Sequence, residues 1–141
     1  MINKNLIENL IQLFKNKKYE ETILQIKKNL DFNNCPPDLI NISAISKLLK
    51  TNNTKEDVFS ALNDLEIYYK RSEKKFQKIE AVTNYISTCV VNSKKYNEIT
   101  AYFKKAEKLY EQCITAVGYD EKLYSRGADL YKYTLNVNKS R

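Results

Sequence analysis

The segment NSKKYNEITAYFKKAEKLY, residues 92–110, has an earlier counterpart in NKKYEETILQIKKNL, residues 16–30. With Lys94 aligned on Lys17, the matching pairs are Lys17 and Lys94, Lys18 and Lys95, Tyr19 and Tyr96, Glu21 and Glu98, Lys27 and Lys104, and Lys28 and Lys105. A weaker copy, TKEDVFSAL, lies between them and has Lys55 where the others have Tyr. Copies spaced by ~34 to 40 residues are typical of two-helix repeats, in which each helical hairpin buries its apolar faces against the next. The repeat therefore predicts stacked helical hairpins.

The composition also favours helices. The chain of 141 residues contains only two Gly and two Pro, too few turn formers for a many-stranded sheet protein. Leu, Ile, Lys, Glu and Ala are abundant and suit helices. The length is that of about one domain, so we predict an all-α fold with a single helical-repeat domain over residues 1–141.

Apolar residues recur at helical spacing in seven blocks. They predict helices at residues 3–15, 18–31, 37–50, 55–70, 73–91, 94–117 and 121–136. Short connections favour antiparallel neighbours, which gives hairpins at 3–31, 37–70 and 73–117 and a C-terminal helix at 121–136. In the helix at 37–50, the predicted buried stripe is Ile42, Ile45 and Leu49.

Helix boundaries are marked by residues with known capping preferences. Pro37 suits a first helical position, and Thr54 with Asp57 forms a capping-box pattern. The remaining predicted boundary residues are Ser72, Ser93 and Asp120 as N-caps and Gly118 as a left-handed helix end.

KKYNEITAYFKKA resembles the second helix of a tetratricopeptide repeat, with Tyr96, Glu98, Ile99, Phe103 and Ala106 at the characteristic positions. LYSRGADLY is similar to a first helix of that family, with Gly127 at the glycine and Leu130 near the usual Tyr. In the earlier copy, Thr22, Ile26 and Asn29 replace the small, aromatic and Ala positions. The resemblance covers about two-thirds of the chain and implies an α-solenoid that binds protein segments. Armadillo-like repeats, proteasome-lid-type repeats and a generic helical bundle stay open as alternatives.

Common catalytic equipment is missing. The chain has no His, which removes Ser-His-Asp and Cys-His systems and the HExxH motif. Its two glycines cannot form a Walker loop or a GxGxxG fingerprint. Cys35, Cys89 and Cys113 are far apart and are expected to be free thiols, and carboxylates such as Asp57 and Asp64 fit a first helical turn or a solvated face. We therefore expect no enzyme, no cofactor and no metal.

The formal charge of +7 raises the question of an anionic partner. Of the 24 basic residues, few are Arg, the residue favoured for bidentate phosphate recognition, and the Lys and Asn richness also fits an A+T-rich genome. On a solenoid, the echoed lysines would lie at equivalent places on the convex side. This basic face comprises Lys17, Lys18, Lys27, Lys28, Lys94, Lys95, Lys104 and Lys105. It could follow a phosphate backbone or be an ordinary solvated surface, and both readings stay open.

Other residues suggest a protein interface. Tyr102, Tyr131 and Tyr133 lie off the apolar stripes and are candidate interface anchors. Some tetratricopeptide domains bind a C-terminal carboxylate, and the candidates implied here are Asn5, Asn9 and Asn41. That device also uses a Lys-x-x-x-Arg pair, and no Arg follows the lysines of the helix at 73–91, so we predict that it is absent.

The leading hypothesis is a non-enzymatic protein-protein interaction module or scaffold subunit of a larger assembly. The alternative is a small basic factor that binds RNA or a ribonucleoprotein particle such as the ribosome. Charged residues interrupt the N-terminal segment MINKNLIENLIQLF, so we expect no signal peptide, no membrane insertion and a cytoplasmic, soluble chain.

Overall fold

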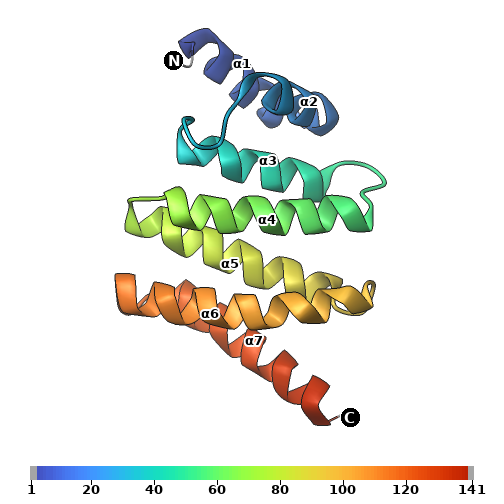
Figure 1. The fold of residues 1–141 in the computed structure, drawn as a ribbon, viewed down its shortest axis with the longest axis vertical. Coiled ribbons are helices and arrows are strands. Elements are labelled where there is room, and N and C mark those ends of the chain that lie inside the picture. The colour runs from blue at the N-terminus through green and yellow to red at the C-terminus, as the bar shows by residue number, and fades with distance from the viewer. Residues whose placement is uncertain (1–2, 140–141) are drawn as a thin grey trace. The chain divides into compact units, whose positions relative to one another are not determined.

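The computed structural model describes residues 3–139, with side chains described for residues 3–135. Every regular element in this part of the chain is helical, so the all-α prediction is confirmed (Figure 1). The elements are α1 (Lys4–Lys15), α2 (Tyr19–Asn29), α3 (Pro37–Leu49), α4 (Lys55–Arg71), α5 (Lys75–Asn92), the 3-10 turn η1 (Asn97–Ile99), α6 (Thr100–Val117) and α7 (Glu121–Lys139).

The chain divides into two compact units. Unit 1 is Met1–Arg71 and unit 2 is Ser72–Arg141, and the division falls between the second and third predicted hairpins. Each unit is described below by itself. The single domain over residues 1–141 stays a prediction.

Unit 1 is built from neighbouring helices that pack in chain order. α1 packs on α2, α2 on α3, and α3 on α4, as the hairpins predicted at 3–31 and 37–70 require. Figure 1 shows α3 and α4 side by side and running in opposite directions. The buried apolar residues are Leu10, Ile26, Cys35, Leu39, Ile40, Ala44, Val58, Ala61, Leu62, Leu65, Tyr68 and Tyr69.

The predicted stripe of α3 is wrong. Leu49 is 57 % exposed, whereas Leu39 and Ile40 are fully buried. α3 packs against both α2 and α4, so it buries more than one face. A helix buried on two sides has no single apolar stripe from which its orientation could be predicted.

Two predicted boundaries of unit 1 are confirmed. Pro37 is the first residue of α3, where its missing N–H leaves no helical hydrogen bond unmade. At the start of α4, the Thr54 N–H donates to Asp57 Oδ2 at 2.8 Å and the Asp57 N–H donates to Thr54 Oγ1 at 3.2 Å. This reciprocal pair is the predicted capping box.

Arg71 holds the loop between α2 and α3. Its guanidinium donates to the backbone carbonyl of Phe32 and, at 2.9 Å, to that of Cys35. The planar fork of Arg can satisfy two carbonyls at once, which a Lys ammonium cannot do with the same fixed geometry. One side chain at the end of α4 therefore fixes the path of a loop far away in the sequence.

Unit 2 contains α5, α6 and α7, each in contact with the other two. The predicted pairing of the helices within 73–117 is confirmed. The buried apolar residues are Ala81, Val82, Tyr85, Ile86, Cys89, Ile99, Phe103, Ala106, Leu109, Cys113, Leu123 and Leu130.

The predicted starts of the two helices at 73–91 and 94–117 need correction. α5 begins at Lys75 rather than after a Ser72 cap. The Ser93 hydroxyl donates backwards to the Val90 carbonyl at 2.8 Å, and Tyr96 is extended with φ −131° and ψ 115°. Here the chain must reverse direction after α5, and this requirement overrides the helical pattern of the sequence.

The boundary between α6 and α7 follows the prediction in part. Asp120 Oδ1 accepts from the Leu123 N–H at 2.9 Å, which confirms the N-cap of α7. Gly118 ends α6 with φ 80° and ψ −153°. Its φ is positive as predicted, but its ψ is not that of the left-handed helix.

Gly127 of α7 lies against the ring of Tyr110 of α6. A Cβ at this position would overlap the ring of Tyr110. Tyr110 in turn packs edge-on against Tyr131, with ring centroids 5.9 Å apart and an interplanar angle of 79°. The absence of a side chain at Gly127 thus makes room for the Tyr110 ring.

We expect Gly127→Ala to lower the free energy of unfolding by about 1–2 kcal/mol, because overpacking outweighs the gain in helix propensity of about 1 kcal/mol. In a Tyr110→Ala background the overlap is gone, and the same substitution should be stabilising by about 1 kcal/mol. Urea unfolding of the four proteins measures both effects. Equal effects of Gly127→Ala in the two backgrounds would contradict the steric explanation.

The turn between α1 and α2 is a Schellman motif. The Lys18 N–H donates to the Leu13 carbonyl at 2.9 Å and the Lys17 N–H to the Phe14 carbonyl at 3.0 Å. Lys17 has φ 60°, a region that usually requires Gly. Its echo partner Lys94 is not among the positive-φ residues of the described chain. The matching lysines therefore lie on different local backbones.

Replacing Lys17 by Gly should stabilise the protein by about 0.5–1 kcal/mol, because relief of the left-handed strain exceeds the entropy lost on ordering Gly. The matched substitution Lys94→Gly should destabilise by a similar amount. Thermal and urea unfolding of the two variants provide the comparison. The same sign for both would show that the backbone conformation at Lys17 is not strained.

Candidate binding grooves

A groove of about 540 Å³ lies in unit 1. We call it the α2–α4 groove because α2, the loop after it, α3 and α4 all contribute. Its lining residues are Ile23, Ile26, Lys27, Leu30, Asp31, Phe32, Ser43, Lys47 and Ser60.

The walls of the α2–α4 groove are apolar. Ile23, Ile26 and Leu30 come from α2 and from the residue that ends it, at intervals of three or four residues that place them along one helical face. Phe32 follows in the loop, where Arg71 binds its carbonyl oxygen. The wall contributed by the loop is therefore held in place from α4.

The residues that α3 and α4 contribute to the groove are polar, and we call these three residues its floor: Ser43, Lys47 and Ser60. Ser43 and Lys47 lie one turn apart on α3, and Ser60 and Asp64 lie one turn apart on α4. Lys47 Nζ lies 2.7 Å from Asp64 Oδ2 and 2.8 Å from Ser60 Oγ, and the Ser43 hydroxyl donates to Asp64 Oδ2 at 2.8 Å. Asp64 is only 4 % exposed, so this cluster is an ion pair inside the α3–α4 contact.

The prediction that Asp64 lies in a first helical turn or on a solvated face is wrong, because its side chain is buried. Desolvation raises the pKa of its carboxyl above the usual 3.8, and the charge and hydrogen bond of Lys47 and the bond from Ser43 only partly oppose this shift. The pKa of Asp57 shifts in the opposite direction. Desolvation raises its pKa too, but the hydrogen bonds from Thr54 and Lys50 outweigh it, and the pKa lies below 3.8.

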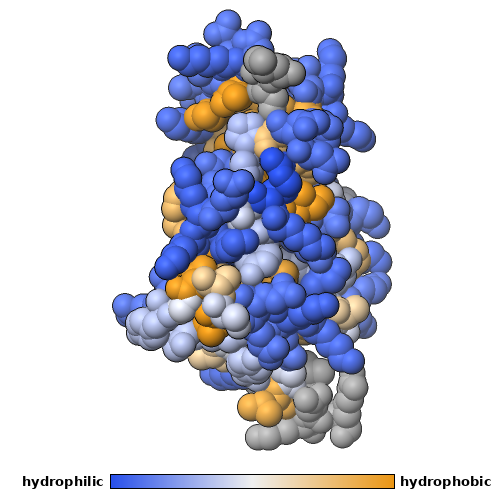
Figure 2. Space-filling model, turned by 60° about the vertical axis from the view of Figure 1, so that its left-hand side comes forward, coloured by the Kyte–Doolittle hydropathy of each residue, from blue (hydrophilic) through white to orange (hydrophobic). Residues whose placement is uncertain are grey.

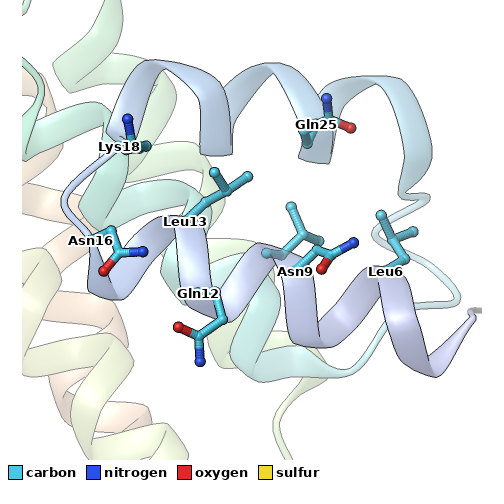
Figure 3. Close-up of a pocket in the computed structure, with 8 residues that line it drawn as sticks. Leu6, Asn9, Gln12, Leu13, Asn16, Lys18 and Gln25 are labelled. Carbon is cyan, nitrogen blue, oxygen red and sulfur yellow. The ribbon is translucent and has the colours of Figure 1, made fainter.

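A second groove of about 410 Å³ lies between α1 and α2 (Figure 3). It is lined by Leu6, Asn9, Leu10, Gln12, Leu13, Asn16, Lys18 and Gln25. In Figure 3, Leu6 and Leu13 point from α1 toward α2, whereas the Gln12 amide points away from α2. The polar part of this α1–α2 groove consists of amides and the ammonium of Lys18, and no carboxylate is among its lining residues.

The three Asn residues considered for partner binding do not line one site. Asn5 and Asn9 are exposed on α1, and Asn9 lines the α1–α2 groove. Asn41 is 8 % exposed on α3 and lines neither groove. Partner binding by these residues stays a prediction.

The three tyrosines considered as interface anchors lie in unit 2. Tyr131 is 40 % exposed and packs edge-on against Tyr110. Tyr133 stacks on Phe103 with ring centroids 6.0 Å apart, and Tyr102 is partly buried on α6. Tyr131 and Tyr133 thus already contribute to the packing between α6 and α7, while part of each ring stays accessible.

The echoed lysines are all exposed, but they divide between the two units. Lys17, Lys18, Lys27 and Lys28 are in unit 1, and Lys94, Lys95, Lys104 and Lys105 are in unit 2. Lys17 and Lys18 border a shallow hollow that also holds Glu20, Glu21 and Lys50. Of these eight lysines, only Lys27 lines the α2–α4 groove. A basic face shared by the two groups stays a prediction.

The residues that form the groove floor were not identified from the sequence. The sequence carries only a weak signal: Ser43 and Lys47 interrupt an apolar helix one turn apart, and Ser60 and Asp64 lie one turn apart on the next helix. Two such polar pairs on consecutive helices can meet across a hairpin. Without the helix orientations, the pairs are indistinguishable from solvated positions.

The thiols are confirmed as free and are buried at all three positions. Burial raises the pKa of Cys89 to about 12 and that of Cys113 to about 11. Burial also raises the pKa of Cys35, although Arg71 opposes this shift. Such thiols are poor nucleophiles at neutral pH.

Residues 3–139 contain no group of three or more His, Cys, Asp or Glu placed to hold a metal ion. None of the helices in that range is both long enough and apolar enough to cross a membrane. The face shown in Figure 2 is largely hydrophilic, and its apolar side chains form small patches.

Comparison with known proteins does not identify a family. No protein-family model, no curated protein and no solved structure matches the chain.

The opposite pKa shifts of Asp64 and Asp57 predict opposite pH dependences. Because the pKa of Asp64 is raised in the folded state, Asp64 stabilises the fold at pH values below its unfolded-state pKa of 3.8, and this contribution disappears as the pH rises through the folded-state pKa. Because the pKa of Asp57 is lowered in the folded state, Asp57 stabilises the fold at pH values above 3.8, and this contribution disappears as the pH falls through the folded-state pKa. We expect the difference in unfolding free energy between the parent and Asp64→Asn to shrink as the pH rises from about 3 to about 7. The difference between the parent and Asp57→Asn should grow over the same interval.

Urea unfolding of the parent and both variants across that interval tests the signs. The two variants serve as controls for each other, since each replaces one Asp of α4 by Asn. Parallel curves for the two would show that the environments of Asp64 and Asp57 do not differ as described.

Proposed function

We propose that this chain is a non-enzymatic interaction module, a scaffold or adaptor subunit whose α2–α4 groove holds a segment of a protein partner. The observation that carries the proposal is the groove itself, which is lined by aliphatic side chains of α2 and by polar side chains of α3 and α4 that the Lys47–Asp64 pair holds. A peptide segment offers both kinds of group, since its side chains can be apolar while its backbone always needs hydrogen-bond partners.

Rigidity of the groove supports this role. Its floor is held by the buried pair of Lys47 and Asp64, and its loop wall is held by Arg71. A surface that is ordered before binding loses less conformational entropy when a partner arrives. A partner segment could therefore bind tightly to an area smaller than a whole protein interface.

We further propose that the repeat is tetratricopeptide-like and that the protein acts in the cytoplasm. Support for the first point comes from the antiparallel packing of consecutive helices in each unit and from the close contact at Gly127. Support for the second comes from the three free thiols, which are usual in a reducing compartment.

Ile23→Asp tests the groove, and Leu24→Asp is its matched control. The two residues are neighbours on α2, but Ile23 lines the groove whereas Leu24 is 63 % exposed and does not. A charge placed in an apolar contact should weaken binding about tenfold or more. We expect affinity purification with quantitative mass spectrometry to recover at least one protein with the parent and with Leu24→Asp, and to lose it with Ile23→Asp.

Circular dichroism and thermal melting show whether Ile23→Asp remains folded. Ile23→Ser, a milder change at the same position, serves if it does not. Partners recovered equally with every Ile23 variant would overturn the groove as the binding site, and so would the recovery of no specific partner.

A further inference from the structure

We infer that the partner segment of the α2–α4 groove carries an aliphatic side chain next to an Asp or Glu. This inference rests on the proposed function and names the chemistry of its ligand. It follows from which hydrogen-bonding groups of the groove are already engaged and which are not.

The acidic groups at the groove already have partners. Asp31 accepts from the Asn33 N–H and from the Asn34 side-chain amide, both at 3.0 Å. Asp64 accepts from Lys47 at 2.7 Å and from Ser43 at 2.8 Å. Asp64 is buried and does not line the groove, so a ligand there would not contact it directly.

Hydrogen-bond donors at the groove outnumber the acceptors that they reach. An ammonium has three N–H donors, and Lys47 directs two of them to Asp64 and Ser60. Ser60 accepts from Lys47, so its own O–H is left to donate. Lys27 is exposed at the groove, and no hydrogen bond or ion pair joins its ammonium to another of the described residues.

The unfilled hydrogen-bonding capacity of the groove is therefore for an acceptor. Because Asp64 already neutralises the charge of Lys47, the ammonium of Lys27 is the group that favours an anionic acceptor. Hydrogen bonds between an ammonium and a carboxylate are stronger than those between neutral groups. The walls are mainly aliphatic, with Ile23, Ile26 and Leu30, which suits an aliphatic side chain better than the flat bases and polar sugars of RNA. An aliphatic residue beside a carboxylate satisfies both parts of the groove.

Selection from a displayed library of random heptapeptides provides the probe. The parent chain is the target, and Ile23→Asp is the counter-target that removes peptides bound elsewhere. We expect the selected peptides to be enriched in Leu, Ile or Val adjacent to Asp or Glu. Peptides that depend on Ile23 but lack an acidic residue would overturn this inference and leave the proposed function standing.

Charge reversal at Lys27 then tests the contact directly, with Lys28→Glu as the matched control. Lys28 is the next residue of α2 and is exposed, but it does not line the groove. Fluorescence anisotropy with a selected peptide should give about tenfold weaker binding for Lys27→Glu and less than about twofold for Lys28→Glu. A peptide with its acidic residue changed to Lys should prefer Lys27→Glu over the parent.

Three outcomes of the binding measurements would overturn the inference. Equal effects of Lys27→Glu and Lys28→Glu would show that only long-range charge matters. Failure of the reversed peptide to prefer Lys27→Glu would show that the acidic residue does not face this lysine. Displacement of the peptide by polyuridylate as effectively as by unlabelled peptide would assign the groove to RNA. If selection yields only peptides indifferent to Ile23, or none, both this inference and the proposed function fail.

Discussion

The buried pair of Lys47 and Asp64 is the interaction on which the rest of unit 1 depends. Removing the Asp64 carboxylate from water costs several kcal/mol, and the Lys47 and Ser43 contacts at 2.7 and 2.8 Å offset part of that cost. Loss of one partner from such a pair typically destabilises a protein by about 3–5 kcal/mol. The pair therefore holds α3 against α4 in one register, and the same register places Ser60 and Lys47 at the floor of the groove.

The features that could be predicted from the sequence are those set by neighbouring residues. Pro37, the Thr54–Asp57 box and the Asp120 cap act within a single helical turn, and the structure has all three. Features set by tertiary packing could not be predicted. Leu49 is exposed because α3 packs on both sides, and Tyr96 is extended because the chain reverses after α5. Local preference and global requirement disagree at these positions, and the global requirement prevails.

The candidate site shows the same division more strongly. The sequence echo points to Lys27, which does line the groove, although the echo indicates a shared basic face rather than a groove. Ser43, Lys47 and Ser60 were not singled out, because their role depends on how α3 faces α4. Asp64 was assigned to solvent, since nothing in its neighbours along the chain distinguishes a buried carboxylate from an exposed one.

The chain-order packing of α1 to α4 bears on how the protein is made. Every packing partner of α1, α2 and α3 described for unit 1 lies within its own 71 residues, between helices adjacent in the chain. Contacts that are short in sequence need little loop closure and form quickly, in roughly microseconds to milliseconds for helical proteins. Translation adds only about 5–20 residues per second. The helical hairpins of unit 1 can thus assemble on the ribosome in the order in which they emerge, before synthesis of α7 is complete.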